Sequence, residues 1–165
     1  ELEYACTKLL QDGLEGILAT IITDDFERMI IKVKKLSTLI QTNRKINSVI
    51  KGIHIEGPFL NPTVGFRGAH PEEFILDVDL EKAKRILNSG NGLIRLFSLA
   101  PEVDPKYKLI EYLSKNNVVV SAGHSDASLE QLQGAIYAGL KMFTHLGNGA
   151  PNILPRHDNI INRVL

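Results

Sequence analysis

The chain has 165 residues, 44% of them hydrophobic and 23% charged, and its 19 basic and 19 acidic side chains balance. This length allows one domain with a real core, and the balanced charge argues against an electrostatic nucleic-acid binder. No run of about 18 apolar residues is present, so we expect no membrane-spanning helix. The single cysteine, Cys6, excludes an internal disulfide. The first residues, ELEY, lack the basic start of a secretory signal, so a cytoplasmic setting is expected.

Segments with helical spacing alternate with short apolar runs along the chain. Hydrophobic spacing and capping residues predict helices over residues 3–14, 26–43, 79–87, 104–114, 128–137 and 157–165. Asp104 and Pro105 are expected to open the fourth of these as N-cap and first-turn proline. Apolar runs predict strands over residues 17–23, 46–56, 93–99, 118–122 and 141–144, the first of them typical of a strand buried on both faces. This alternation predicts βαβ units, and hence an α/β fold with a parallel sheet.

The predicted strands fit either a doubly wound open sheet or a (β/α)₈ barrel. Polar clusters follow at least three strands, which favours the barrel, because barrels collect active-site residues from many strands at one face. A complete barrel takes about 250 residues. We therefore expect residues 1–165 to form a single incomplete barrel domain of about five βα units, truncated at both ends.

Three chemically distinctive residues lie where predicted strands stop: Glu56, His124 and His145. If their strands are parallel neighbours, these side chains meet at one edge of the sheet. A carboxylate and two imidazoles are donors that zinc and its neighbours bind, and three protein ligands leave room for water and substrate. The alternatives are a Glu56 carboxylate that caps loop amides and a His124 that is only hydrogen-bonded.

Further polar candidates lie in the loops. His70 ends a long Gly/Pro-rich loop over residues 57–71 and is a candidate for binding a substrate oxygen, although a surface position fits equally well. Residues 147–150, GNGA, present backbone amides that suit an anion. Arg156 supplies a planar charge that suits a phosphate, whereas His54 lies within its strand and is expected to be structural. The chain has no P-loop, no GxGxxG and no nucleophile elbow.

Four segments carry a specific resemblance: HIEGPFLNP at 54–62, GAHP at 68–71, AGHSDA at 122–127 and FTHLGNG at 143–149. Together they resemble the N-acetylglucosamine-6-phosphate deacetylase family of the amidohydrolase superfamily, over about residues 52–157. The resemblance implies a metal-dependent (β/α)₈ barrel. It also implies hydrolysis of the N-acetyl amide of N-acetylglucosamine 6-phosphate to glucosamine 6-phosphate and acetate.

Carried over position by position, the resemblance assigns metal ligation to Glu56, His124 and His145. It assigns substrate binding to Ala69, His70, Asn148, Gly149 and Arg156, the last of them on the sugar phosphate. The donor set suits one divalent metal, zinc first, with iron, cobalt and manganese also open. The resemblance also implies a homodimer for the full-length protein.

The chain departs from the family pattern in two ways. The segment after the metal-binding His usually reads Leu-Phe/Tyr-Asn-Ala-Met in the family, whereas residues 146–150 read LGNGA and keep only Asn148 of the last three. The catalytic Asp of the family lies downstream of the residues present, and Asp158 does not replace it, because it falls at the start of the last predicted helix. The first barrel strand, which supplies a second metal site in some members, is also missing. This chain alone is therefore expected to be inactive.

Two other functions stay open. The changed loop at 147–150 allows a deacetylase of another phosphorylated amino sugar, such as N-acetylgalactosamine 6-phosphate. A non-catalytic metal-binding or sugar-phosphate-binding module is the third reading. For the enzyme, the expected partner is a phosphorylated amino-sugar substrate, with no nucleic acid and no membrane.

Overall fold

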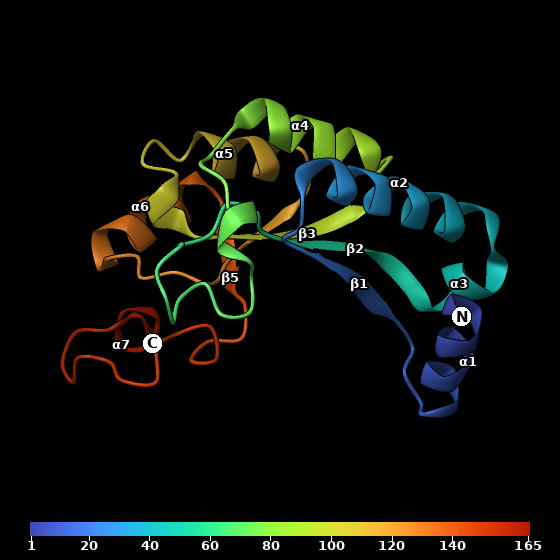
Figure 1. Cartoon of the computed structure of the whole chain (residues 1–165), viewed down its shortest axis with the longest axis horizontal. Coiled ribbons are helices and arrows are strands. Elements are labelled where there is room, and N and C mark those ends of the chain that lie inside the picture. Colours follow the sequence, from blue (N-terminus) through green and yellow to red (C-terminus); the bar gives the residue numbers. More distant parts are fainter.

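The computed structural model describes residues 1–165 and contains one five-stranded parallel sheet (Figure 1). The strands are β1 (Ile17–Ile22), β2 (Ile50–Glu56), β3 (Ile94–Leu99), β4 (Val119–Ala122) and β5 (Leu140–Phe143). The helices are α1 (Leu2–Gln11), α2 (Phe26–Thr42), α3 (Arg44–Val49), α4 (Leu80–Ser89), α5 (Lys108–Lys115), α6 (Leu129–Ala138) and α7 (Ile160–Val164). Two 3₁₀ turns, Glu72–Phe74 and Pro101–Val103, follow β2 and β3. The expected α/β class is confirmed.

The order of the strands distinguishes the two architectures that the sequence left open. The order is β1-β2-β3-β4-β5, and every neighbouring pair is parallel. Each crossover therefore moves one position in the same direction, as in a barrel, and there is no point where the order reverses as in a doubly wound sheet. The outer strands β1 and β5 do not pair with each other, so the sheet is an open part of a barrel-type fold.

The core lies between the sheet and the helices on its outer face. Figure 1 shows α2, α4 and α5 along this side of the curved sheet. Alternate strand residues point into this core and are fully buried, among them Ile53, Ile55, Phe97 and Leu99. The rings of Phe97 and Phe59 stack with their centroids 6.2 Å apart. None of the helices has the length and apolar character that crossing a membrane requires.

The opposite, inner face of the sheet is exposed in part, which corrects one expectation. Strand β1 is not buried on both faces, because its residues alternate between half-buried and exposed. Leu18 and Ile22 are 36% and 49% exposed, and Val119 and Met142 on β4 and β5 are 41% and 49% exposed. These side chains belong to the face that carries no helix, so no described element covers them.

A helix replaces part of a predicted strand. Residues 46–49 were expected to begin the second strand, but they belong to α3, and β2 begins only at Ile50. Asn43 starts α3, because its side-chain oxygen accepts hydrogen bonds from the Lys45 and Ile46 amides. The apolar residues Ile46 and Val49 are three apart and both pack into the core, which is helical spacing.

The start of α5 also differs from the prediction. Pro105 lies in a turn and not in the first helical turn, and the helix begins at Lys108. Asp104 is not the N-cap residue either, because Tyr107 occupies that position. Its buried carboxylate nevertheless accepts hydrogen bonds from the first-turn amides of Leu109 at 3.0 Å and Ile110 at 3.1 Å. At the other predicted caps, Asp79 caps α4 and Ser128 forms a capping box with Gln131 at α6.

The open edges and the exposed inner face predict that the isolated chain self-associates. Unpaired strand edges and contiguous apolar side chains promote association between copies. Light scattering at micromolar concentration should therefore show species larger than the 18.3 kDa monomer. Met142→Lys should reduce the association, whereas Val64→Lys, at an exposed loop position, should not. A wild-type chain that stays monomeric under these conditions would contradict this prediction.

Candidate metal centre

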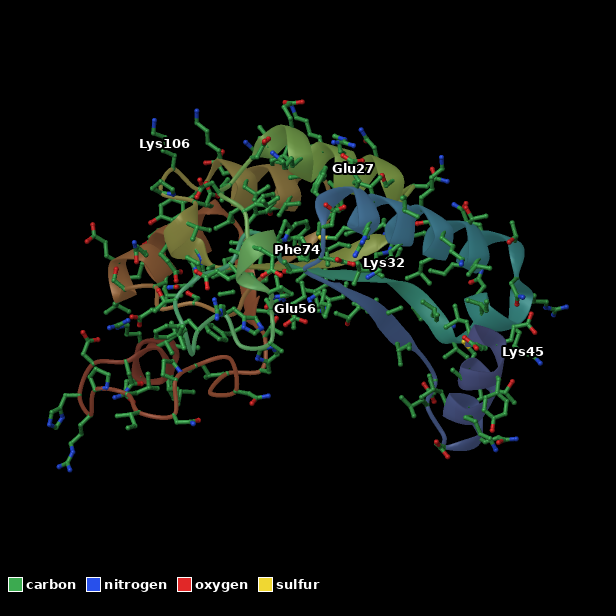
Figure 2. The ribbon with its side chains drawn as sticks, in the orientation of Figure 1. Glu27, Lys32, Lys45, Glu56, Phe74 and Lys106 are labelled. Carbon is green, nitrogen blue, oxygen red and sulfur yellow. The ribbon has the colours of Figure 1, made fainter.

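Three side chains meet at the carboxyl edge of the sheet, each from a different strand end. Glu56 is the last residue of β2 and leads into the loop that carries Phe74 (Figure 2), whereas His124 and His145 follow the ends of β4 and β5. One ligand atom from each residue lies within 4.8 Å of the other two. The structure therefore brings together the three residues that the sequence predicted as metal ligands.

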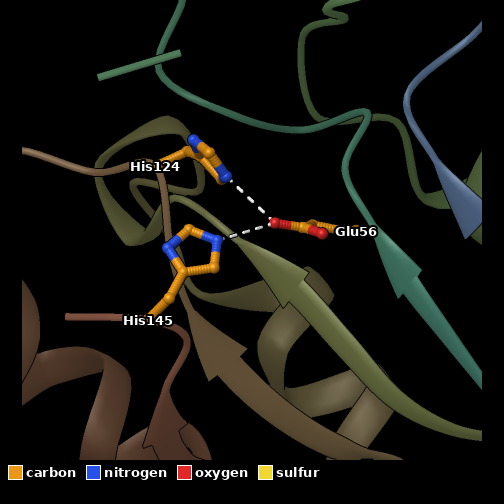
Figure 3. Close-up of side chains that lie close together, drawn as sticks. All are labelled: Glu56, His124 and His145. Atoms are coloured by element: carbon orange, nitrogen blue, oxygen red, sulfur yellow. Dashed lines mark hydrogen bonds and ion pairs between the residues drawn. The ribbon is translucent and has the colours of Figure 1, made fainter. Parts of the chain in front are cut away.

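The Glu56 carboxylate is the meeting point of this group (Figure 3). Its Oε1 atom lies 3.0 Å from His124 Nε2 and 2.9 Å from His145 Nε2. The two imidazole rings pack edge to face, with their centroids 4.8 Å apart. Glu56 and His124 are buried, whereas the His145 side chain is 34% exposed, so the group opens to solvent on the His145 side.

The orientation of the His124 ring suits a metal ligand. Its Nδ1 lies 2.8 Å from the backbone carbonyl oxygen of Phe66, and a carbonyl can only accept, so Nδ1 carries the proton. The other nitrogen, Nε2, faces Glu56 Oε1 and is the one that a metal would take. A histidine ligand held in this way by a carbonyl is the usual arrangement in metal sites.

Two glycines leave the space that the imidazoles occupy. A Cβ atom on Gly68 would lie 2.9 Å from His124 Cε1. A Cβ atom on Gly149 would lie 3.0 Å from His145 Cε1 and 3.3 Å from His124 Nδ1. Both glycines therefore allow the backbone to approach the rings more closely than any other residue would permit.

His70 adds a third imidazole beside the carboxylate. Its Nε2 lies 3.2 Å from His124 Nε2 and 3.7 Å from Glu56 Oε1, and its Nδ1 lies 2.8 Å from Thr23 Oγ1. The side chain is buried, which rules out the surface position left open for it. The hydrogen bond with His124 first, then the nearby His70 imidazole and the hydrogen bond with His145, hold the pKa of the Glu56 carboxyl far below its usual range, although burial opposes this. Glu56 is therefore ionised at neutral pH.

A second polar layer lies beneath this group on the inner face of the sheet. His54 Nε2 lies 2.8 Å from Ser98 Oγ and His54 Nδ1 lies 3.1 Å from Thr20 Oγ1. Thr144 Oγ1 in turn lies 2.7 Å from the hydroxyls of Ser98 and Ser121. Burial lowers the pKa of the His54 imidazole, which keeps this ring neutral at pH 7. The contacts agree with the structural role expected for His54.

The other predicted substrate-binding residues lie at different distances from the group. Gly149 packs against both ligand rings, and the amide of Asn148 donates to the His145 carbonyl at 2.9 Å, with the Asn148 side chain exposed. Ala69 is exposed next to buried His70. Arg156 is also exposed, and no hydrogen bond or ion pair joins its guanidinium to the three predicted ligands. The structure thus brings His70 and Gly149 to the group, but not the Arg156 side chain.

Two features of the site were missed in the sequence. His124 and His145 have left-handed backbone dihedrals, with φ of +52° and +35°. Such values are uncommon outside glycine and often mark functional sites. Thr23 and Glu102 also hold residues of the site, and no sequence signal marked either of them as part of it.

Substitution of Gly68 tests the packing around His124. Gly68→Ala places a methyl group against the ring and should weaken zinc binding about tenfold, in the range found when a ligand loses its support. Gly92→Ala is the matched control, because Gly92 also has positive φ (+75°) but has nothing within 4 Å of an added Cβ. Competition with a chelator measures both affinities. Equal affinities for the two variants would contradict a role of Gly68 in placing His124.

The chain is similar in sequence to amino-sugar deacetylases. It is 30% identical to "N-acetylglucosamine-6-phosphate deacetylase" of Bacillus subtilis (strain 168), over 99% of this chain and 41% of the relative. It is 35% identical to "N-acetylgalactosamine-6-phosphate deacetylase" of Shewanella sp. (strain ANA-3), over 92% of this chain and 36% of the relative. No protein-family model matches the chain. The chain thus spans about two fifths of the length of these curated relatives.

The fold is similar to a solved deacetylase structure. The crystal structure of N-acetyl-D-glucosamine-6-phosphate deacetylase from Mycobacterium smegmatis superposes with a TM-score of 0.78 at 30% identity. The superposition covers 90% of this chain and 38% of that one. The family resemblance read from the four motifs and the partial barrel architecture are both confirmed by these matches.

Proposed function

We propose that this chain is the metal-binding part of an enzyme that hydrolyses the N-acetyl amide of N-acetylglucosamine 6-phosphate to glucosamine 6-phosphate and acetate. The observation that carries the proposal is the meeting of Glu56, His124 and His145 at the carboxyl edge of a barrel-type sheet. In barrels this edge is where active sites lie. The names of the relatives supply the substrate class.

The three donors fit a divalent metal. They are an ionised carboxylate and two imidazole nitrogens, and the contact of His124 Nδ1 with the Phe66 carbonyl turns its Nε2 toward Glu56, where a metal would bind. We propose one ion, zinc in the first place, with iron, cobalt and manganese as the alternatives to be tested. When bound, the ion would polarise an amide carbonyl and lower the pKa of a bound water to about 7.

The remaining predicted residues receive substrate-binding roles in this proposal. Buried His70, beside Glu56, would contact a substrate oxygen, and Ala69, Asn148 and Gly149 would line the same opening. Arg156 would bind the sugar phosphate, for which its planar guanidinium is well suited. Arg156 is exposed, so its guanidinium is accessible to such a ligand.

The proton transfers of the reaction are assigned to a residue outside this chain. No described aspartate reaches the Glu56 carboxylate or its imidazoles. Asp158 is exposed, and its carboxylate accepts a hydrogen bond from Arg163 Nε at 2.6 Å, so it is not a candidate for the catalytic base. We therefore propose that residues 1–165 form one incomplete barrel domain, inactive by itself. We also propose that the full-length protein is a cytoplasmic homodimer.

A second candidate substrate comes from the relatives and from the loop after His145. The chain is 35% and 26% identical to two N-acetylgalactosamine-6-phosphate deacetylases and 30% and 31% identical to two bacterial N-acetylglucosamine-6-phosphate deacetylases, so its relatives include both specificities. The unusual LGNGA segment at residues 146–150 lies directly after His145. The galactosamine isomer is therefore the alternative substrate.

Removal of single donors tests the metal site. The purified chain should bind about one equivalent of zinc, as measured by elemental analysis. Glu56→Gln and His124→Ala should each lower the affinity by at least tenfold, since each removes one of three ligands. His157→Ala, at an exposed histidine that is not a member of the group, is the control and should keep the wild-type stoichiometry. Equal zinc content in all four proteins would contradict the proposed ligand set.

Acetate release tests the reaction and its substrate. The full-length protein should release acetate from N-acetylglucosamine 6-phosphate faster than from the galactosamine isomer, and this 165-residue chain should release none from either. Glu56→Gln in the full-length protein should lower kcat by at least a hundredfold, because it removes a metal ligand. The reverse preference would establish the alternative substrate. Sugar-phosphate binding without turnover in the full-length protein would establish the non-catalytic module instead.

A further inference from the structure

We propose that Glu102 is a positioning residue for the metal centre, which it serves by fixing the backbone of His124. Glu102 lies in the 3₁₀ turn after β3, and its half-buried carboxylate joins the loops that carry Glu56 and His124. The inference rests on the proposed metal site, but none of the comparisons assigns a role to this residue.

The Glu102 carboxylate accepts three hydrogen bonds from two different loops. Its Oε1 accepts from the Asn61 side-chain amide at 2.9 Å and from the Asp126 backbone amide at 2.7 Å. Its Oε2 accepts from the Ser125 hydroxyl at 2.6 Å. Asn61 lies in the loop that begins at Glu56, and residues 125 and 126 directly follow His124. One side chain therefore ties together the segments that provide two of the three predicted ligands.

The His124 backbone needs this support because of its conformation. Its φ of +52° lies in the left-handed region, which is unfavourable for residues other than glycine and persists only where the surroundings hold it. The backbone N–H of Asn61 donates to the His124 carbonyl at 3.1 Å, while the Asn61 side chain donates to Glu102. The same residue therefore contacts both His124 and Glu102. On the ring side, the imidazole is contacted by the Phe66 carbonyl, by His70 and by the backbones of Gly68 and Gly149, but none of these contacts fixes the backbone of His124 itself.

Loss of the carboxylate would release all of these contacts at once. The Asp126 amide and the Ser125 hydroxyl would lose their acceptor, and Asn61 would lose its anchor. His124 would then be free to return to an ordinary backbone conformation, which moves its Nε2 away from Glu56. Supporting residues of this kind change metal affinity by about 10–100-fold in other metal sites.

Asp104 provides a matched control two residues away in sequence. Its buried carboxylate also accepts two backbone hydrogen bonds, but both come from the first turn of α5, at Leu109 and Ile110. Substitution of Asp104 therefore destabilises the fold without touching the loops that carry the ligands. A comparison of the two residues separates positioning of the metal site from general stability.

The test measures the zinc affinity of the full chain by chelator competition and the visible absorption of its Co²⁺ form, with unfolding followed by circular dichroism. We expect Glu102→Ala to weaken zinc binding by at least tenfold and to change the Co²⁺ spectrum. Glu102→Gln keeps one acceptor oxygen for Asn61 and Asp126, so it should recover part of the affinity. Asp104→Ala should lower the unfolding midpoint but keep the affinity within twofold and leave the spectrum unchanged.

Provided that the wild-type chain binds zinc, either of two results would overturn the inference. One is that Glu102→Ala binds zinc as tightly as the wild type; the other is that Asp104→Ala loses as much affinity as Glu102→Ala. If Glu102→Ala does not fold, Ser125→Ala serves as the test instead, because it removes one of the three hydrogen-bond donors to the Glu102 carboxylate. Its affinity should fall about threefold, and an unchanged value would again overturn the inference. Absence of zinc binding in the wild-type chain would instead contradict the proposed function itself, so the two failures are distinguishable.

Discussion

One carboxylate oxygen, Glu56 Oε1, lies within 3.0 Å of imidazole nitrogens from His124 and His145, and these contacts join the ends of β2, β4 and β5. A buried carboxylate is costly unless charge or hydrogen bonds compensate it. Here three imidazoles surround it, and the pKa of Glu56 is held far below its usual range. The loops at this edge of the sheet hold the imidazoles in place. The Phe66 carbonyl orients the His124 ring, and Gly68 and Gly149 leave room for the rings. Glu102 accepts hydrogen bonds both from Asn61 and from Ser125, which follows His124.

The sheet has one face that helices cover and one face that is open. The outer face is buried under helices, whereas the inner face exposes apolar side chains at Leu18, Val119 and Met142. The strand order places all crossovers in one direction and leaves an unpaired edge on β1 and on β5. The chain spans about two fifths of its curated relatives. The covered outer face and the open inner face agree with the partial barrel architecture.

Much of this arrangement could be predicted from the sequence, because strand ends and ligand types are local signals. All five strands were expected, and so was the convergence of Glu56, His124 and His145, since parallel strands share one carboxyl edge. The helix α3 was missed because Ile46, Val49 and Ile50 were assigned to one strand, although Asn47 and Ser48 interrupt them, and the Asn43 cap that begins the helix is a weak signal. The left-handed backbone of His124 and the contacts of Glu102 depend on loops distant in sequence, so no local pattern contained them.

X-ray absorption at the zinc edge of the zinc-loaded chain tests the central claim most directly, because it reports the ligands themselves. The account predicts a first shell of nitrogen and oxygen only, with the multiple-scattering signature of two imidazoles, reduced to one in His145→Ala. A sulfur ligand would contradict it, because the only cysteine, Cys6, is buried on α1 and is not one of the three proposed ligands. A shell without imidazole scattering would contradict it equally, since the metal would then lie away from the carboxyl ends of β4 and β5.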